Sequence, residues 1–494
     1  MAVRTPKLPA PVGGWNTRDP LAGMAQTDAV VLKNIIPEPS GPEIRDGYVL
    51  SHTLLSTSFW VDTLFSWKTP VGARLIAGAG ASASSFGLYD ITTSTVTTIK
   101  TGFVKGKWRH AVMLNQCGMV NGSDDPIKLT YSPGGLVLKN MPINGMGSGN
   151  VANRIHIFKN RSWFCSGREP AAYHSEINAL GGNVTKFPLD RVSSTGGNVI
   201  EISSWTRDGG IGPDDYLVFF LDTGEVLVYA GSNPTDADDW GIVGRYFMGK
   251  VLAVSQFGGK IHAVTDMDYN VLPDDFISQG VRQPSKLSGA AQAAVSKDQT
   301  DNWQIVFDTK RAWRIVNVPA GNLREQHVLS LKSGGATRFD IQANVWASHA
   351  GELYFGGKNG IVYKMQGSTD NGTAIEFACQ QAYVDFGLPQ NKTVLNYRPL
   401  WTTGGNFTFS TGLAYDYEVN SFIQSVETEG ESGAAWDTGT WDVSSWASNG
   451  GSKTQWLDGA GEGQSVSLFI NGTSTKKARW NHTDYRIDIA RDTI

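Results

Sequence analysis

The chain has 494 residues, of which 57 are glycine, 16 are tryptophan and only 18% are charged. Its 42 basic and 46 acidic residues nearly balance, which removes the bulk electrostatic argument for tight nucleic-acid binding. The three cysteines (Cys117, Cys165 and Cys379) are far apart and form no C-x-x-C pair, so neither a disulfide framework nor a zinc ribbon is predicted.

Composition predicts an all-β protein made in the cytoplasm. Chains rich in glycine and aromatic residues, with many Val, Ile and Thr, favour β architectures with numerous tight turns. The length suggests two to four domains. The first residues lack an apolar signal-peptide core, and no run approaches the ~18 apolar residues of a membrane helix. We therefore expect a soluble protein without stable membrane insertion.

Residues 13–48 are predicted to form an irregular arm with one or two helical turns. Asp28 stands where an N-cap would open the short apolar run of residues 29–32. Four residues then prevent a continuing helix: Pro37, Pro39, Gly41 and Pro42. This composition cannot build a core of its own, so the arm must be ordered by contacts elsewhere.

The arm also carries a sequence signature: Gly-Gly-x-Asn, then Asp-Pro, then an Asn with a Pro/Gly turn, then Arg-x-Gly-Tyr. The matching positions are Gly13, Gly14, Asn16, Asp19, Pro20, Asn34, Pro37, Gly41, Arg45, Gly47 and Tyr48. The signature resembles the amino-terminal region of nozzle proteins from short-tailed bacteriophages (podoviruses), a group that includes packaged-DNA stabilisation and tail tubular proteins. The resemblance is strong in the arm and moderate in the carboxyl-terminal region. In the middle of the chain it is limited to the expected architecture.

Residues 60–374 repeat a pattern of short strand, tight turn and short strand. The clearest units cover residues 216–232, 250–272, 302–318 and 344–365, and weaker ones begin near Leu64, Lys107 and Arg154. Successive units start roughly 35 to 60 residues apart, close to the spacing of four-stranded propeller blades. The pattern predicts a β-propeller of about seven blades; a β-sandwich or an irregular multi-sheet fold is the alternative.

Residues 375–494 are predicted to form a small β-sandwich that serves as a platform. Alternating apolar residues indicate strands at Tyr383, Val384, Phe386, Phe407, Phe409, Leu413 and Tyr415. A low-charge stretch then contains Trp436, Trp441, Trp446 and Trp456. We expect these rings in a core or a subunit interface, with sugar binding as the alternative. The predicted domains are thus the arm with its platform contacts (1–59), the propeller (60–374) and the sandwich (375–494).

Adjacent carboxylates suggest catalysis or metal binding, but three of the four pairs lie next to Pro or Gly and are interpreted as turn residues. The four pairs are Asp124-Asp125, Asp214-Asp215, Asp238-Asp239 and Asp274-Asp275. Neighbouring strand residues point to opposite faces, so no single pair supplies the two facing carboxyls of a glycosidase. The oxygen-rich string 121–125 lacks the spacing of a calcium loop.

No spacing in the chain indicates a catalytic, cofactor or metal site. The eight histidines lack metal-ligand spacing: His52, His110, His156, His174, His262, His327, His349 and His482. Residues 74–83 mimic a dinucleotide-binding turn, but a β-like segment follows where the helix should be. We therefore predict no catalytic residue, no cofactor, no metal and no enzyme activity.

Two short basic clusters remain as candidate contacts with phosphate. One comprises Lys100, Lys105, Lys107, Arg109 and His110 around Trp108, and the other comprises Lys476, Lys477 and Arg479 before Trp480. Cations interleaved with aromatic rings can hold a phosphate backbone, although such clusters at β-turns are commonly solvated loops.

The resemblance implies a structural protein of the virion tail: a nozzle below the head-tail adaptor that retains packaged DNA and is the conduit for its ejection. It implies a homo-oligomeric ring, usually a hexamer. The implied partners are the adaptor and portal complex, tail fibres or tail-tip proteins, and double-stranded DNA held weakly and without sequence specificity. The alternative is a carbohydrate-binding or carbohydrate-cleaving propeller, such as a tailspike-like depolymerase or a sialidase-type enzyme. The sequence lacks the Asp-box repeats of the latter.

Overall fold

The structure is a computed structural model that describes residues 3–132, 135–208, 213–271, 285–300, 302–321, 323–418, 423–430, 452–453 and 455–489. Strands make up 57% of the chain and helix 3%. The prediction of an all-β fold is therefore confirmed. Within the described residues, none of the helical segments has the length and apolar character needed to cross a bilayer.

Four small antiparallel sheets follow one another in the first half of the chain. The first contains β8 (Val61–Thr69), β9 (Gly72–Ser82), β10 (Ser85–Asp90) and β11 (Thr97–Phe103). The second contains β12 (Arg109–Met113), β13 (Gln116–Val120), β14 (Ile127–Ser132) and β15 (Gly135–Asn140). The third contains β17 (Arg154–Phe158), β18 (Arg161–Cys165), β19 (Ala171–Ser175) and β20 (Gly182–Pro188), with β16 (Ile143–Asn144) parallel to β20. The fourth contains β21 (Val199–Asp208), β22 (Pro213–Leu221), β23 (Glu225–Ala230) and β24 (Gly241–Phe247).

Three further sheets continue this series. The fifth contains β25 (Val251–Phe257), β26 (Lys260–Thr265) and β27 (Tyr269–Val271), and α1 (Ser288–Lys297) follows it. The sixth contains β28 (Gln304–Asp308), β29 (Trp313–Ala320), β30 (Leu323–Ser330) and β31 (Ala336–Phe339). The seventh contains β32 (Val345–His349), β33 (Glu352–Gly356) and β34 (Ile361–Met365), together with β7 (Tyr48–Thr53) from the arm.

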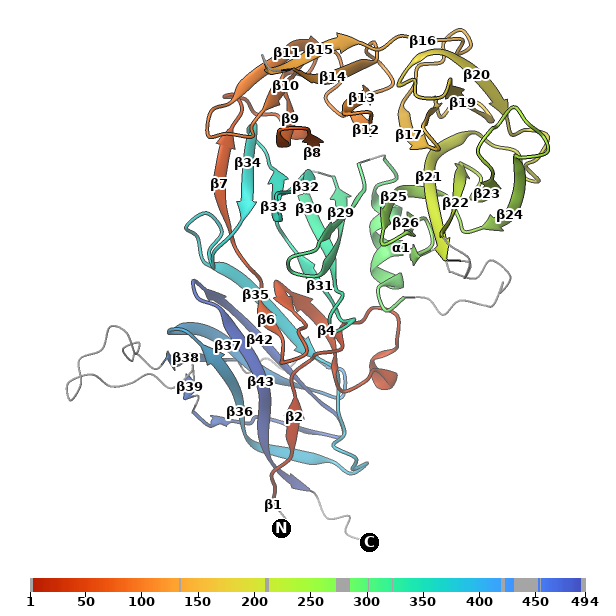
Figure 1. Cartoon of the computed structure of the whole chain (residues 1–494). Helices are drawn as coiled ribbons and strands as arrows, with labels where there is room; N and C mark the ends of the chain where they lie inside the picture. Colours follow the sequence, from red (N-terminus) through yellow and green to blue (C-terminus); the bar gives the residue numbers. More distant parts are fainter. Residues whose placement is uncertain are drawn as a thin grey trace.

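The seven sheets, here called the ring, are arranged in a circle (Figure 1). The seventh sheet contains strands from both ends of the series, because β7 pairs antiparallel with β34. It packs against the first sheet through β32 and β8, and Val345 and Ala347 share a buried cluster with Val61 and Leu64. The hydrogen-bond ladder between β7 and β34 therefore ties the start of the ring to its end.

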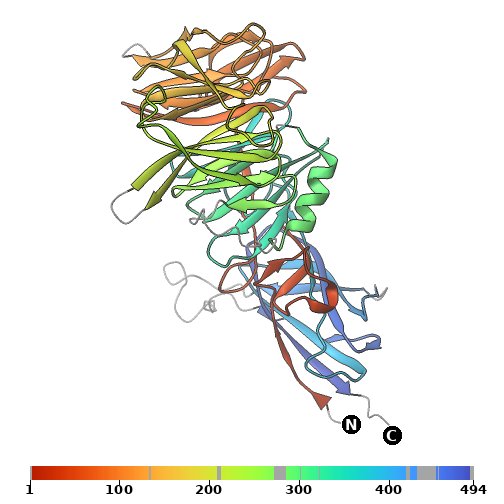
Figure 2. The ribbon, with the colours of Figure 1, turned by 90° about the vertical axis from the view of Figure 1, so that its right-hand side faces the viewer.

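Two larger sheets lie below the ring and contain the carboxyl-terminal strands (Figure 2). One consists of β36 (Lys392–Thr403), β43 (Ala478–Ile489), β40 (Leu457–Asp458), β41 (Glu462–Gly463) and four arm strands: β1 (Val3–Arg4), β2 (Lys7–Pro9), β5 (Ile35–Ile36) and β6 (Glu43–Ile44). The other extends the sixth ring sheet through β3 (Gly14–Trp15), β4 (Asp28–Lys33), β35 (Ile375–Gln381), β42 (Val466–Ser474), β37 (Phe407–Tyr415), β38 (Gln424–Gly430) and β39 (Ser452–Lys453). We call these two sheets the base.

The expectation of a helix opened by Asp28 is wrong, since this segment is strand β4. A helix of only four or five residues is unstable by itself, and the β-branched Val30 and Val31 favour a strand. Pairing decides the outcome, because β4 is bonded to β3 on one side and to β35 on the other. The arm contains a single 3₁₀ turn in the described residues, at Leu21–Gly23.

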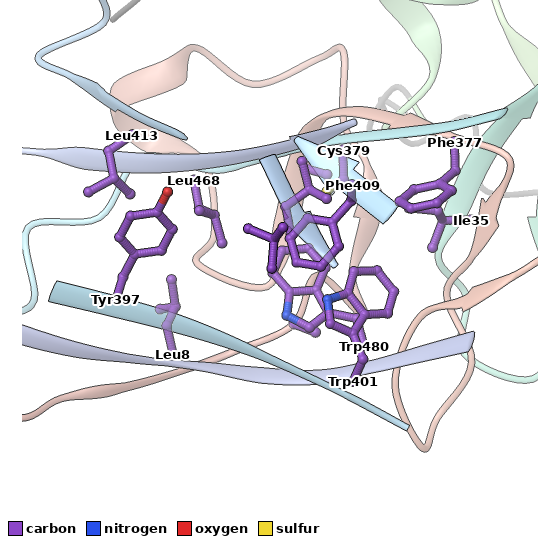
Figure 3. Packing of buried hydrophobic residues seen from close by; sticks show 14 of the residues in the cluster. Leu8, Ile35, Phe377, Cys379, Tyr397, Trp401, Phe409, Leu413, Leu468 and Trp480 are labelled. Carbon is purple, nitrogen blue, oxygen red and sulfur yellow. The ribbon is translucent and has the colours of Figure 1, made fainter. Parts of the chain in front are cut away.

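The core of the base is aromatic and lies between its two sheets (Figure 3). Trp401 on β36 and Trp480 on β43 are fully buried and stack with their ring centres 5.7 Å apart. Phe407 and Phe409 of β37 approach Trp401 from the other sheet at 5.3 and 5.9 Å. The alternating apolar residues predicted at 407–415 thus do form a strand with one face in the core.

A buried carboxylate stabilises the fourth ring sheet. Glu225, at the start of β23, is only 2% exposed. It accepts hydrogen bonds from the Ser193 hydroxyl (2.5 Å), the Ser194 N–H (3.0 Å) and the Thr195 hydroxyl (2.9 Å). Burial by itself would raise the pKa of Glu225, but these hydrogen bonds outweigh it and lower the pKa to about 2.

We expect Glu225→Gln to lower the free energy of unfolding at pH 7 by about 2 kcal/mol, because the amide turns an N–H group towards donors. The folded pKa lies below the ordinary value of 4.5, so the carboxylate's contribution is complete above that pH and is lost as the pH falls towards 2. Urea titrations should show that the difference in free energy of unfolding between wild type and variant is smaller at pH 3 than at pH 7. Glu176→Gln is the control, since that side chain is 79% exposed. A difference in free energy that is the same at both pH values would contradict a stabilising role for the ionised Glu225.

Candidate functional site

Arg45, which belongs to the signature, is buried between the ring and the base. Its Nη1 and Nη2 atoms donate to the two carboxylate oxygens of Asp370 at 2.8 and 2.7 Å. Its Nε atom donates to Asn34 Oδ1 at 2.9 Å, and the guanidinium lies 5.5 Å from the centre of the Phe339 ring. A bidentate pair of this kind fixes the geometry of both partners.

Asn34, another signature residue, extends the same network. It follows β4 with a positive φ of 57°, a conformation that asparagine tolerates better than most residues. Its Nδ2 atom donates to Asp340 Oδ1 at 2.6 Å and to the Glu376 carbonyl at 2.7 Å. Asp340 also pairs with Lys33 at 2.7 Å. Because Asp340 follows β31 and Asp370 follows β34, the network joins two ring sheets to the base.

A second network surrounds Asp28, which is buried at the start of β4. Asn16 Nδ2 donates to Asp28 and to Asp19, both at 2.8 Å. Lys286 Nζ lies 2.7 Å from Asp28, and the Lys286 carbonyl accepts a hydrogen bond from the Thr17 N–H. Since Lys286 lies two residues before the start of α1, these contacts hold the helix of the ring against the arm.

Two signature glycines stand where segments of the chain touch. A Cβ atom on Gly47 would lie 2.0 Å from the Thr369 carbonyl oxygen. Gly14 has a φ of +82°, and a Cβ atom there would lie 2.3 Å from the Ala336 nitrogen. Any larger residue at Gly47 or Gly14 would therefore separate the arm from its neighbours.

Three signature residues, Asn16, Asn34 and Arg45, thus take part with their polar partners in a joint between the ring and the base. We call it the arm joint: Asn16, Asp28, Asn34, Arg45, Lys286, Asp340 and Asp370. Sequence reasoning identified the signature but missed Lys286, Asp340 and Asp370. Each of these partners lies more than 250 residues from the arm residue that it contacts, and no local pattern marks them.

A cavity of about 330 Å³ lies at the centre of the ring and is lined from all seven sheets or the segments that lead into them. The first basic cluster is divided here, because Lys107, Arg109 and His110 line the cavity together with Trp108. Lys100 and Lys105 do not line it; the Lys100 amine lies 5.2 Å from the centre of the Phe103 ring instead.

The cavity wall is polar, and many of its charges are paired. Arg154 and Glu201 form an ion pair at 2.7 Å, and Lys107 donates to Asn302 at 3.3 Å. Burial raises the pKa of Asp62 to about 6. Burial also lowers the pKa of His156 to about 4, so this ring is neutral at pH 7. The cavity therefore combines paired ions with neutral hydrogen-bonding groups.

A second cavity, of about 620 Å³, lies between the arm, the ring and β43, and we call it the junction groove. The second basic cluster contributes Lys477 and Arg479 to it, but Lys476 does not line it. Lys477 pairs with Asp46 at 2.5 Å, and Arg479 pairs with Glu43 at 3.1 Å. Arg311 reaches Asp46 from the ring at 2.6 Å. This groove gathers ions from segments far apart in sequence.

Of the carboxylates singled out by sequence, Asp124 supports a turn, whereas Asp215 lies within strand β22, so the turn interpretation is wrong for it. Asp124 accepts hydrogen bonds from the N–H groups of Val104 (2.9 Å) and Lys105 (3.0 Å) and from Asn121 (2.7 Å), so the oxygen-rich string braces a turn. Asp215 accepts a hydrogen bond from Thr206 at 2.7 Å. The side chain of Asp214 and the pair Asp274-Asp275 lie outside the described residues.

The histidines and cysteines are dispersed. Over the described ranges, no group of three or more His, Cys, Asp or Glu side chains has the arrangement of a metal site. All three cysteines are buried and free, and burial raises the pKa of each thiol, for Cys165 to about 12. Residues 74–83 lie on β9 and in its turn to β10, as the absence of a following helix suggested.

The tryptophan-rich stretch is described only at its end. Trp436, Trp441 and Trp446 lie outside the described residues. Trp456 is half-buried, and the guanidinium groups of Arg398 and Arg486 lie 4.7 and 4.4 Å from its ring centre. This ring thus stacks with cations at the surface of the base.

Comparison with known proteins adds little to this geometry. No family model matches the chain, and no curated protein matches it. Among solved structures, the chain is similar to a functionally unknown protein from Desulfotomaculum acetoxidans DSM 771, with 13% sequence identity and a TM-score of 0.36. The similarity covers 57% of this chain and 85% of that chain. A likeness of this degree identifies neither a fold nor a function.

Proposed function

We propose that the ring is a seven-bladed β-propeller and that the base is a β-sandwich platform. The propeller is supported by seven consecutive small sheets, by a central cavity lined from every one of them, and by the closing strand β7. The sandwich is supported by an aromatic core that lies between two sheets.

We propose that this protein is a tail nozzle of a short-tailed bacteriophage. The observation that carries the proposal is the arm joint. Residues that match the nozzle signature help to hold the ring to the base, for example Arg45 through Asp370 and Asn16 through Asp28. A signature that maintains the relative position of two parts fits a protein whose role is mechanical.

In this role, several copies of the chain assemble in a closed circle around a channel below the head-tail adaptor. The resemblance implies six copies. The platform packs the copies together, and each copy carries a propeller. The channel encloses the end of the packaged DNA and opens at ejection, so retention depends on closure and release. The near balance of 42 basic and 46 acidic residues suits a conduit, because many phosphate contacts would resist a moving duplex.

Particles assembled without this protein test the proposal. We expect their heads to fill and then to lose DNA, so the genome becomes sensitive to added nuclease. Restoring the wild-type protein should restore protection, whereas adding an unrelated propeller should not. Full protection of the genome in particles that lack the protein would refute a nozzle.

The isolated protein is also expected to bind duplex DNA weakly. Six to ten phosphate contacts would give tight binding with a steep dependence on salt, but the sequence has only two short basic clusters and a near balance of charge. A filter-binding titration at about 150 mM salt should therefore give no saturation at nanomolar protein. Nanomolar affinity would show that direct binding to the duplex, and not its enclosure in the channel, retains the genome.

A further inference from the structure

The junction groove exposes its lysines more than its carboxylates. The lysines at its edges are half exposed: Lys310 (54%), Lys332 (49%) and Lys477 (53%). The carboxylates are more deeply placed: Glu38 (18%), Glu43 (22%), Asp46 (17%) and Glu352 (27%). A group that approaches from solvent therefore meets positive charge first.

One groove cation, Lys364, forms no ion pair with the described residues, although its charge helps to lower the pKa of Glu352. Lys364 lies half-buried on β34 and lines the groove. Seven basic and four acidic side chains line the groove, although the whole chain has a formal charge of −4. Two of these cations have counter-ions outside the lining, since Arg45 pairs with Asp370 and Arg311 with Asp308, so the remaining excess of positive charge lies on the lysines. The groove is thus a local positive site on a slightly acidic protein, and it fits an acidic partner.

The chain carries an acidic projection on the fourth ring sheet. Residues 231–240 connect β23 to β24, and residues 235–239 are all exposed. Asp239 accepts hydrogen bonds from the N–H groups of Ser232 (2.8 Å) and Asn233 (2.7 Å), and Trp240 anchors the end of the turn in a buried cluster. Asp238 has no ion pair with any described residue. The contacts of Asp239 and Trp240 already order both ends of the turn, which lowers the ordering entropy that docking would cost.

We propose that this acidic turn of one copy docks into the junction groove of the next copy. The proposal rests on the ring assembly of the proposed function and names its contact. In Figure 1, β24 lies at the edge of the ring opposite to β34 and β7. If the acidic turn of one copy binds the junction groove of the next, the contact is head-to-tail. Contacts of this type can close into a circular oligomer. A cavity of about 620 Å³ holds the side chains of one turn and is too small for a DNA duplex.

Charge reversal in the turn tests the contact. Asp238→Lys should weaken subunit association at least tenfold, as measured by mass photometry and sedimentation, because like charges then face each other. Asp125→Lys is the matched control, since it reverses an exposed aspartate on the turn of another ring sheet and should leave association unchanged. Wild-type association should also weaken as salt rises, because salt screens exposed charges.

The reciprocal variant and the charge swap make the test specific. Lys364→Glu should weaken association like Asp238→Lys, whereas Lys358→Glu, on the turn before β34, should not. The double variant Asp238→Lys/Lys364→Glu should recover association, because each contact again pairs opposite charges. Thermal melting confirms that each variant is folded.

The outcomes separate the two proposals. If wild-type rings form and both reversals assemble as wild type does, the docking contact is wrong and the nozzle remains. If the single reversals weaken association but the double variant does not recover it, the turn and the groove do not meet. A wild-type chain that stays monomeric at every concentration, also with tail components present, refutes the ring and the contact together.

Discussion

Arg45→Ala is expected to lower the free energy of unfolding by about 3–5 kcal/mol, the range for removing one partner of a buried ion pair. Arg45 is 2% exposed, and its loss leaves the Asp370 carboxylate without its bidentate donor. It also leaves Asn34 Oδ1 without the Nε donor and opens a space beside Phe339. Urea unfolding at pH 7, followed by circular dichroism, measures the loss.

Two further variants identify the cause of that loss. Arg45→Lys keeps the charge but cannot reproduce the two parallel hydrogen bonds, so it should recover only part of the stability. Asp370→Asn combined with Arg45→Ala should cost less than the sum of the single changes, since the two residues interact directly. Arg191→Ala, at an exposed position, should change stability little. A loss below about 1 kcal/mol in Arg45→Ala would contradict an energetic role for the arm joint.

The strand pattern of the ring was predictable because it is local. Units such as 216–232 alternate apolar residues around a turn that contains Asp222 and Gly224, and the structure forms the hairpin β22–β23 there. Period-two alternation and turn chemistry depend only on neighbouring residues. The arm was predicted less well, because β4 is a strand only through its pairing with β3 and β35.

The arm joint and the junction groove were not predictable, because their partners are distant in sequence. Arg45 meets Asp370 across 325 positions, and Asn34 meets Asp340 across 306. Neither aspartate lies in a motif. The basic cluster around Trp108 shows the reverse case, in which residues close in sequence lie apart in the structure. Lys100 and Lys107 were grouped because they are near each other in sequence, but of the two only Lys107 lines the central cavity. Lys100 lies on β11 of the first ring sheet, whereas Lys107 leads into β12 of the second, so the two side chains have different surroundings.

Trp401→Ala is expected to cost about 3–5 kcal/mol, the range for truncating a large buried aromatic residue. Trp401 is 1% exposed and contacts rings from both sheets of the base, including Trp480, Phe377 and Phe409 (Figure 3). Alanine leaves a cavity between the sheets, and the neighbouring rings are too constrained by β-sheet backbone to fill it. Trp401→Phe should recover much of the loss.

The matched control for this change is Trp456→Ala, on the surface of the same base. Trp456 is half-buried and interacts with Arg398 and Arg486 through ring faces, and such exposed cation–π contacts contribute about 0.5–1 kcal/mol. Chemical unfolding of both variants measures the difference. Equal losses would mean that the stacked pair Trp401–Trp480 is not the centre of the core. A large loss in Trp401→Ala alone would show that Trp401, between the sheets, stabilises the base much more than Trp456 at its surface.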